Sequence, residues 1–253
     1  MKIATWNVNS LRVRLNDVCA WMDAQGPDVL ALQETKVEDA HFPVAAFSDR
    51  GYQAVYSGQK TYNGVALLSR HPAADARLEL VAWDPQKRYV AVTIGGVRMV
   101  NVYVPNGAQV DSDKYVYKLR WLEALRTALQ EELRQYPELL LMGDFNIAPE
   151  DEDVHDPAAW MGSVLVSPQE RACFRGLLGL GLADVFRAFP QEAGTFSWWD
   201  YRVGAFRRNH GLRIDHILAS RPLAERCRGC AVDRGPRAGD RPSDHAPVVA
   251  EFA

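Results

Sequence analysis

The apolar and polar positions near the N-terminus predict a parallel β-α-β unit. Residues 2–8 form a mostly apolar run that indicates a strand. Ser10 is expected to cap the helix that follows, and Gly26 is expected to end it. The apolar stripe of this helix consists of Leu11, Leu15, Val18 and Met22. Residues 28–32 are a short apolar run, typical of a second buried strand parallel to the first.

Short apolar runs in the next section predict antiparallel strands. They span residues 53–57, 64–69, 89–94 and 97–104. Turns rich in Gly, Pro and Asp separate them, and the runs lie too close together for helices between them. We therefore expect this section to be antiparallel.

The second half of the chain returns to helices alternating with strands. A long amphipathic helix is expected at residues 112–135, with Pro137 closing it and with an apolar face of Leu119, Leu122, Leu125, Leu129 and Leu133. The remaining elements are a helix at 168–178 and strands at 139–142, 195–198, 213–219 and 247–252. No linker or short repeat interrupts the sequence, so we expect one α/β domain over residues 1–253, with two packed sheets and helices outside them.

The composition is that of an ordinary globular domain. With 47% hydrophobic and 24% charged residues, the chain is neither disordered as a whole nor collagen-like. No segment approaches the ~18 consecutive apolar residues of a membrane helix, and the first residues lack the apolar core of a signal peptide. We therefore expect a cytoplasmic protein without a membrane partner. Cys227 and Cys230 have metal or redox spacing but no second ligand pair, so all four cysteines are expected to be reduced thiols.

The small net charge of −3 hides a local asymmetry. Residues 138–156 include seven carboxylates and neither Lys nor Arg, whereas residues 197–245 contain ten arginines against six carboxylates. The arginine-rich stretch would bind a polyanion such as DNA, because phosphate neutralisation releases condensed counterions. A solvated arginine-rich surface is the alternative, and charge alone does not choose between the two.

Polar side chains lie where the predicted strands end. They are Asn7, Glu34, Tyr103, Asn106, Asp144, Asn146, Asp215, Asp244 and His245. In α/β folds, strand ends gather residues from distant parts of the chain into one crevice. An oxygen-rich set with one histidine suits Mg²⁺, with Mn²⁺ as an alternative, since hard cations take carboxylate ligands and bridge to phosphates. The spacing Asp144-x-Asn146 also begins a calcium loop, but Pro149 stands at the required glycine and excludes that interpretation.

Six segments taken together resemble the exonuclease III family of DNA-repair enzymes. In chain order they are residues 6–14 (WNVNSLRVR), 32–36 (LQETK), 143–147 (GDFNI), 196–202 (FSWWDYR), 211–215 (GLRID) and 242–247 (PSDHAP). The resemblance implies the four-layer α/β sandwich of the DNase I-like superfamily. It also implies an apurinic/apyrimidinic (AP) endonuclease with 3′-phosphodiesterase, 3′-phosphatase and 3′-to-5′ exonuclease activities. The partner would be double-stranded DNA with abasic sites or damaged 3′ ends, and the protein is expected to be a monomer.

The resemblance also implies which residues face the metal. Glu34 is expected to be the principal ligand with Asn7 beside it, and Asp244 to lie at or near the ion. The whole expected metal-facing set is Asn7, Glu34, Asp144, Asn146, Asp244 and His245.

Five residues are expected to act on the phosphate and the water, again by resemblance. His245, paired with Asp215, contacts the scissile phosphate either as a base or as a charged electrophile. An imidazole oriented by a carboxylate has a raised pKa, which favours the charged form. Asp144 orients or deprotonates the attacking water, Asn146 fixes it, and Tyr103 donates to the phosphate.

The remaining expectations concern substrate contacts. Trp198, Leu212 and Ile214 match an apolar pocket for a base-free sugar, although all three could instead be core residues. Arg202 and Arg213 are expected to bind DNA.

Alternative functions remain at this stage. Inositol-phosphate 5-phosphatases, sphingomyelinases and deadenylases share the Glu, Asp-x-Asn and Ser-Asp-His pieces, and a degenerate relative could hold DNA without turnover. Residues 196–202 and 211–215 favour the repair branch. Two departures leave the balance between AP incision and 3′-end processing open: Asn106 stands where relatives often have Gln, and residues 161–167 differ from better-known members.

Overall fold

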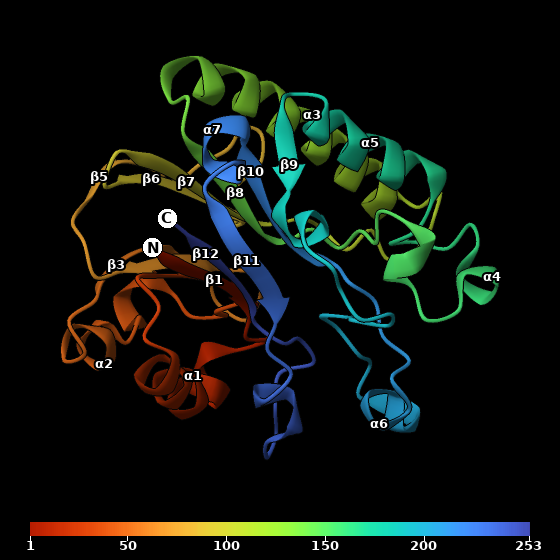
Figure 1. Ribbon diagram of the computed structural model, residues 1–253, viewed down its shortest axis with the longest axis horizontal. Coiled ribbons are helices and arrows are strands. Elements are labelled where there is room, and N and C mark those ends of the chain that lie inside the picture. The colour runs from red at the N-terminus through yellow and green to blue at the C-terminus, as the bar shows by residue number, and fades with distance from the viewer.

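Two six-stranded sheets pack face to face in the computed structural model, which describes all 253 residues (Figure 1). The first sheet contains, in spatial order, β11 (Cys227–Val232), β12 (Val248–Phe252), β1 (Lys2–Asn7), β2 (Val29–Gln33), β4 (Val65–Ser69) and β3 (Gln53–Ser57). The second contains β5 (Ala73–Arg77), β6 (Tyr89–Ile94), β7 (Val97–Tyr103), β8 (Leu139–Asp144), β10 (Asp215–Ser220) and β9 (Leu182–Asp184). Both sheets are mixed, because β1 with β2 and β7 with β8 are parallel while the other pairs are antiparallel.

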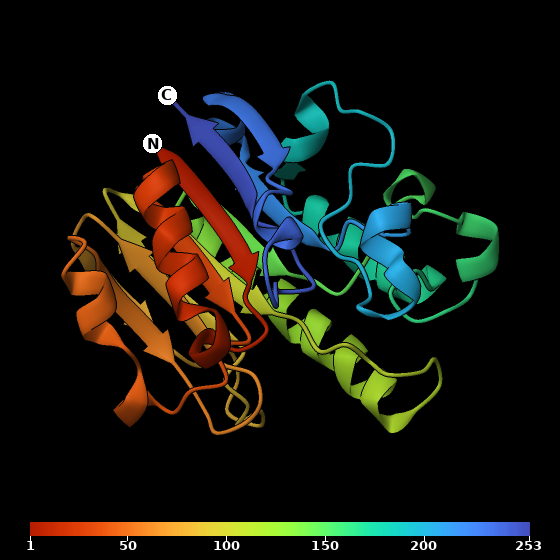
Figure 2. The same cartoon turned by 90° about the horizontal axis from the view of Figure 1, so that it is seen from below.

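Helices cover the outer face of each sheet. Figure 1 shows α3 (Asp113–Gln135) and α5 (Pro168–Leu178) above the second sheet, and α1 (Leu11–Gln25) and α2 (Val44–Ser48) below the first. The short helices α4 (Pro157–Trp160) and α6 (Ala205–Arg208) lie at the end of the molecule away from both termini (Figure 2), and α7 (Arg221–Ala224) follows β10. No helix is both long and apolar enough to cross a membrane. The predicted four-layer α/β sandwich is confirmed.

Each interface between layers has its own apolar core. A cluster of 21 buried residues fills the space between the sheets, and includes Ile3 and Val29 from the first sheet and Met142 and Ile217 from the second. A second cluster of 18 contains residues of α3, α5 and the second sheet, and a third of 16 contains residues of α1, α2 and the first sheet. The central strands β2, β4 and β8 are buried on both faces, which is why they appear in the sequence as continuous apolar runs.

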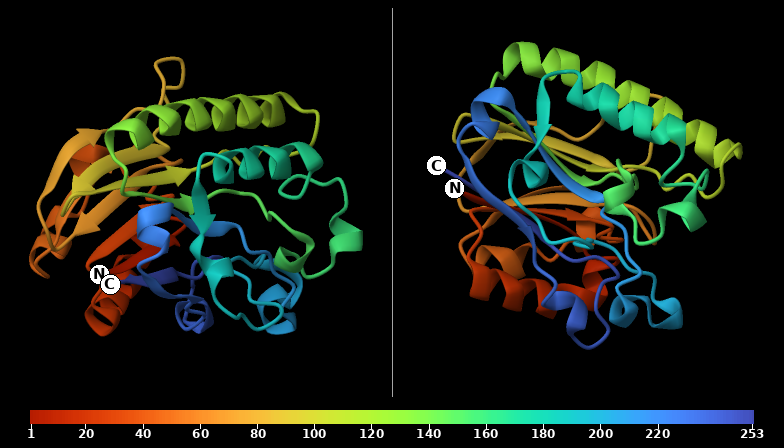
Figure 3. Two further views of the ribbon diagram at one scale, coloured as in Figure 1. Left: turned by 45° about the horizontal axis from the view of Figure 1, so that its top comes forward. Right: turned by 45° about the vertical axis from the view of Figure 1, so that its right-hand side comes forward.

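The two chain ends lie side by side (Figure 3). The N-terminal ammonium donates to the carbonyl of Phe252, and β1 pairs with β12 along its length. The last strand therefore joins the first in the middle of a sheet, and carries the segment around His245 to the end of β1.

Most predicted helix boundaries agree with the structure, but one cap differs. Ser112 caps α3, and its side chain accepts from the amide of Tyr115, as serine does at N-caps. Ser10 makes no side-chain cap, so that prediction is wrong. Instead, the amides of Ser10 and Leu11 donate to carbonyls at the end of β2, which ties the start of α1 to that strand. Gly26 ends α1 in the left-handed conformation, with φ 56°.

The strands missed by sequence reasoning lie near sheet edges. β5 and β11 are edge strands with exposed or mixed faces, and β11 has an irregularity between Cys227 and Gly229. The strand predicted at 195–198 is reduced to isolated bridges from Trp198 to Leu212 and His245, and the strand predicted from 213 begins at Asp215. Edge strands are short of apolar alternation because only one neighbour pairs with them.

Candidate active site at the ends of both sheets

Strand pairing places several predicted site residues side by side. In the second sheet Tyr103 pairs with Asp144, and Asp144 pairs with Asp215, so three neighbouring strands each contribute one residue. In the first sheet Asn7 pairs with Gln33, the residue before Glu34. Paired residues project from the same face of a sheet, so residues distant in sequence meet at one edge.

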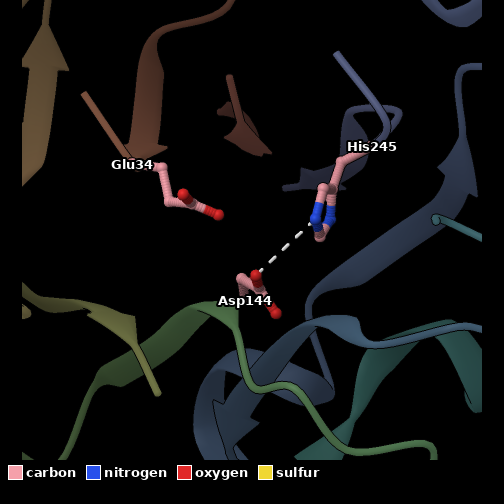
Figure 4. A group of neighbouring side chains, drawn as sticks. All are labelled: Glu34, Asp144 and His245. Carbon is pink, nitrogen blue, oxygen red and sulfur yellow. Dashed lines mark ion pairs between the residues drawn. The ribbon is translucent and has the colours of Figure 1, made fainter. Parts of the chain in front are cut away.

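Glu34, Asp144 and His245 form the centre of the site (Figure 4). Their potential ligand atoms all lie within 4.8 Å of one another. Asp144 and His245 are buried, with Nε2 of His245 3.7 Å from Oδ2 of Asp144, whereas the Glu34 side chain is 17% exposed. Glu34 has φ 51°, in the left-handed region that residues other than glycine rarely adopt. Such strain is common at functional sites.

Gly143 allows β8 to approach β7 closely enough to bring Asp144 beside Tyr103. Its φ is 145°, and a Cβ atom there would lie only 2.0 Å from the carbonyl oxygen of Val102. A side chain at this position would push the strands apart just before the Asp144 carboxylate. The lack of a side chain at Gly143 therefore allows the close approach of the two strands at the site.

Burial and neighbouring charges shift the pKa values of Asp144 and His245. Burial raises the pKa of Asp144, and although His245 opposes this and Asp215 adds to it, the outcome is about 7. Burial alone would lower the pKa of His245, but the Asp215 and Asp144 carboxylates outweigh it and raise the pKa to about 10. His245 therefore carries a positive charge at neutral pH.

The donor set fits a divalent cation of the Mg²⁺ or Mn²⁺ type. Glu34 and Asp144 bring two carboxylates together, the ligand chemistry that these hard cations prefer. A charged His245 has no free lone pair at Nε2, so it suits a phosphate oxygen better than a metal. Lys36, which sequence reasoning did not select, lies with Nζ 2.9 Å from Oε2 of Glu34. Its only signal in the sequence was its place in the LQETK segment.

Two residues of the expected metal-facing set, Asn7 and Asp244, make hydrogen bonds to neighbouring side chains. The Asn7 amide nitrogen donates to Glu34 Oε1 at 2.9 Å and to Asp144 Oδ2 at 2.8 Å, while its oxygen accepts from the Asn9 amide. Asp244 accepts from Asn9 at 2.9 Å and from Trp198 Nε1 at 3.0 Å, and it lies outside the central group. Asn7 and Asp244 therefore hold neighbouring side chains, and neither presents an oxygen to the central group.

Asn146 and Tyr103 flank the central carboxylate. Asn146 has φ 50° and its backbone N–H donates to Asp144 Oδ1 at 2.8 Å. Its side-chain oxygen accepts a hydrogen bond from the Asn106 amide nitrogen at 3.0 Å. Burial raises the pKa of Tyr103 well above its ordinary value, and Glu34 and Asp144 add to the rise. Tyr103 is therefore a neutral hydroxyl donor at any working pH.

Comparisons with known proteins identify the family. Residues 4–245 match the model of the Endonuclease/Exonuclease/phosphatase family. The chain is 37% identical to exodeoxyribonuclease III of Haemophilus influenzae, with all of both chains covered. The chain belongs to this family. Its structure is similar to that of the 3′ phosphatase NExo from Neisseria bound to a product DNA hairpin, with TM-score 0.98, 47% identity and 100% and 99% of the two chains covered. It is also similar to an AP endonuclease from Archaeoglobus fulgidus, with TM-score 0.96, 43% identity and the same coverage.

Within this exonuclease III family member, Arg213 is a core residue, so the prediction that it contacts DNA is wrong. It is 1% exposed, and its guanidinium pairs with Asp153 at 2.6 Å and with Asp184 at 2.8 Å. It also contacts Nδ1 of His216, a buried residue that points away from Asp215. Because it is buried and already paired with two carboxylates, this guanidinium is not accessible to a DNA phosphate.

Arg202 does lie on the surface, in the short helix η4 (Arg202–Gly204). Its side chain is 83% exposed and pairs with Asp200 at 2.7 Å. Arg207 and Arg208 of α6 are also exposed, while Arg237 is buried and Arg221 and Arg226 pair with glutamates. Of the ten arginines in this stretch only Arg213 and Arg237 are buried, and the exposed ones include the group on η4 and α6.

The three residues of the expected sugar pocket lie in one apolar cluster, and that cluster is closed. Leu212 is 0% and Ile214 is 1% exposed, while Trp198 is half-buried at its edge. The other buried members are Ala148, Val154, Leu165 and Val166. Leu165 has φ 78°, a strained conformation for a side chain with a Cβ atom. In this conformation Leu212 and Ile214 offer no surface to a ligand.

A hollow of about 610 Å³ opens beside Tyr103 and was not anticipated from the sequence. Polar and aromatic side chains line it, among them Tyr62, Arg88, Asn106, Lys114 and Tyr117. These residues come from separate loops and from α3, so no contiguous motif could have revealed the hollow.

Proposed function

We propose that this chain is a Mg²⁺-dependent DNA-repair phosphodiesterase that processes blocked 3′ ends and incises duplex DNA on the 5′ side of abasic sites. The observation that carries the proposal is the convergence of Glu34, Asp144 and His245, with Asp215 behind the imidazole, at one end of both sheets. This arrangement provides carboxylates for a cation and a cationic donor for a phosphate within one small volume. Membership of the exonuclease III family supports DNA as the substrate.

Each residue has a role that follows from its surroundings. Glu34 and Asp144 would hold Mg²⁺, or Mn²⁺ in its place, which when bound neutralises phosphate charge and stabilises the leaving oxygen. His245 donates from Nε2 to a phosphate oxygen, and Asp215 keeps the imidazole charged and oriented. Tyr103 donates from its hydroxyl to the same phosphate.

Asp144 also orients the attacking water and accepts its proton. The backbone amide of Asn146 holds the Asp144 carboxylate in place for this role. Asn106 and Asn146 form one hydrogen-bonded edge of this water position.

The exposed Arg202, Arg207 and Arg208 would bind the DNA backbone. Arg88 and Lys114 in the hollow beside Tyr103 supply a second cationic surface next to the catalytic residues. Two basic surfaces around the site would hold a DNA duplex across the site. Contacts with phosphates position the duplex but do not depend on its base sequence. We further propose that one catalytic domain over residues 1–253 acts as a monomer in the cytoplasm, where the four free cysteines would stay reduced.

The closed cluster around Leu212 and Ile214 supports 3′-end processing as the faster activity. A flipped abasic sugar would need this buried cluster to open before it could contact Leu212 or Ile214. A terminal 3′ phosphate has no such requirement, since it needs only the central group.

The test uses three 5′-labelled duplexes, which carry a nick with a 3′ phosphate, a recessed 3′ end or an internal abasic site. With Mg²⁺ we expect all three to be processed, and the abasic site most slowly. No hydrolysis of any duplex, together with rapid hydrolysis of a small inositol phosphate, would instead favour a different phosphoesterase.

A further inference from the structure

We propose that the buried ion pair of Lys118 and Glu170 is a positioning device for the catalytic asparagines. Lys118 lies on α3 and Glu170 on α5, and both side chains are 0% exposed. Neither has been assigned a role in the reaction, and the inference deepens the proposed function, on which it rests.

All three ammonium hydrogens of Lys118 have acceptors. Nζ donates to the carbonyl of Asn106 at 3.1 Å, to the carbonyl of Asn146 at 2.6 Å and to Glu170 Oε1. Burying an ammonium ion is costly unless every donor is paired, and here two of the three acceptors belong to the edge of the water position. The buried ammonium group of Lys118 therefore holds the backbone carbonyls of two site residues, Asn106 and Asn146.

The contact with Asn146 matters because its backbone is in the left-handed region, at φ 50°. Its amide holds Asp144 Oδ1 and its side chain bonds Asn106, so a shift of this residue moves the catalytic carboxylate as well. Lys118 clamps the carbonyl on the other side of the same residue. The strained conformation is thus fixed from both of its peptide groups.

Glu170 extends the clamp to the segment that contributes Leu165 and Val166 to the apolar cluster. Its Oε1 accepts from the Leu165 amide at 3.0 Å, and its Oε2 accepts from the Ser167 amide at 3.1 Å and the Ser167 hydroxyl at 2.5 Å. One ion pair therefore joins Asn146 to Leu165. The residue that holds the Asp144 carboxylate and a buried member of the apolar cluster therefore belong to a single hydrogen-bonded network.

The chain contains a matched control, the buried pair of Arg98 and Glu132. Arg98 is 3% and Glu132 is 6% exposed, and Glu132 lies on the same helix as Lys118. Arg98 pairs with Leu139 at the start of β7 and β8, whereas Tyr103 and Asp144 pair at their ends. Both pairs are buried charges attached to α3, but only the pair at Lys118 contacts the site.

The experiment compares Lys118→Met/Glu170→Gln with Arg98→Met/Glu132→Gln. Neutralising both partners avoids an unpaired buried charge, so each protein should fold with a moderate fall in melting temperature. Activity on the duplex with a 3′ phosphate is measured well below each melting temperature. We expect the Lys118 variant to lose about 10–100-fold in kcat with little change in KM, as for residues that orient metal ligands, and the Arg98 variant to keep wild-type kcat. Equal kcat values for the two variants would overturn the proposal.

A rescue variant keeps the test decisive if the first protein does not fold. Lys118→Gln/Glu170→Gln retains an amide donor for the asparagine carbonyls. Its kcat should lie below that of the wild type but above one tenth of it. A wild-type kcat would overturn the proposal. If the wild-type chain hydrolyses no DNA, the proposed function fails, and Mn²⁺ affinity measured by electron paramagnetic resonance decides this inference instead. Weaker Mn²⁺ binding in the Lys118 variant than in the Arg98 variant supports it, and equal binding contradicts it.

Discussion

Nδ1 of His245 lies 2.9 Å from Oδ2 of Asp215, and both side chains are buried. The same carboxylate oxygen accepts from the Ser197 hydroxyl at 2.6 Å, which fixes Asp215 from the other side. The imidazole is therefore held with Nε2 facing Asp144 and the reaction site. His245 and Asp215 therefore form one hydrogen-bonded unit, in which the carboxylate favours the charged form of the ring and sets its orientation.

Because His245 and Asp215 form one unit, we expect the losses of kcat caused by substituting each residue not to add up in the double variant. His245→Ala and Asp215→Ala should each lower kcat by roughly 10²–10⁴-fold, since each removes the oriented cation, and the double variant should be little worse than either. Steady-state kinetics on the 3′-phosphate duplex provides the measurement. Losses that multiply in the double variant would show that the two side chains act independently.

His216, next to Asp215 in β10, predicts a pH dependence of stability. It is buried, and burial first and Arg213 second lower its pKa to about 4. Between pH 4 and the unfolded value of about 6.5, the unfolded chain binds more protons than the folded chain, so stability present above about pH 6.5 is lost as pH falls toward 4.

The shift corresponds to about 3 kcal/mol of unfolding free energy over this range. Urea unfolding in EDTA at several pH values should therefore show a smaller loss of stability on acidification in His216→Gln than in the wild type. Parallel curves for the two proteins would mean that His216 does not titrate as its surroundings indicate.

The closed apolar cluster predicts that Leu165 limits abasic-site incision. Leu165→Gly removes the side chain and relieves the strain of φ 78°, so Leu212 and Ile214 should become accessible. We expect the ratio of abasic-site incision to 3′-phosphate removal to rise about ten-fold, a change of about 1.4 kcal/mol in relative barriers. An unchanged ratio in a folded variant would separate this cluster from abasic recognition.

Trp198→Ala tests the same cluster from its exposed edge. As part of a sugar pocket, Trp198 should affect the preference for an abasic site and leave the melting temperature nearly unchanged. As a core residue, its truncation should cost about 3–5 kcal/mol and leave the preference intact. Paired measurements of melting temperature and rate ratio distinguish these outcomes.

The sequence predicted the buried parts of the fold and the central residues of the site. Central strands such as β2 and β8 are buried on both faces, so their apolar runs were clear, and Glu34 and Asp144 follow directly where such runs end. Edge strands such as β11 carry no comparable pattern.

The errors at the site have a common physical cause, which is long-range pairing. Arg213 is buried because it forms ion pairs with Asp153 and Asp184, which lie far from it in the sequence. Arg202 has no buried carboxylate partner and is exposed. The residues next to each arginine in the sequence do not distinguish the two cases. The closing position of Leu165 likewise depends on Glu170 and Ala148, which hold its backbone from elsewhere in the chain.

DNA binding by the exposed arginines predicts a steep dependence of affinity on salt. Each phosphate contact contributes a slope near −0.9 in log K against log[salt], so Arg207→Ala and Arg208→Ala should each reduce the slope by about one contact. Arg221→Ala is the matched control, because Arg221 is exposed but lies on α7 beyond the opposite end of β10. Fluorescence anisotropy across a salt series provides the slopes. A flat dependence in the wild type would argue for a small phosphorylated substrate.

The most direct test of the account is removal of a 3′ phosphate from nicked duplex DNA as Mg²⁺ is titrated, in the wild type and in Glu34→Gln. We expect activity that rises with Mg²⁺, disappears in EDTA and is nearly absent in Glu34→Gln. The melting temperature of this variant should stay close to that of the wild type, because Glu34 lies at the partly exposed edge of the site. Near wild-type activity of Glu34→Gln at saturating Mg²⁺, or full activity of the wild type in EDTA, would contradict it.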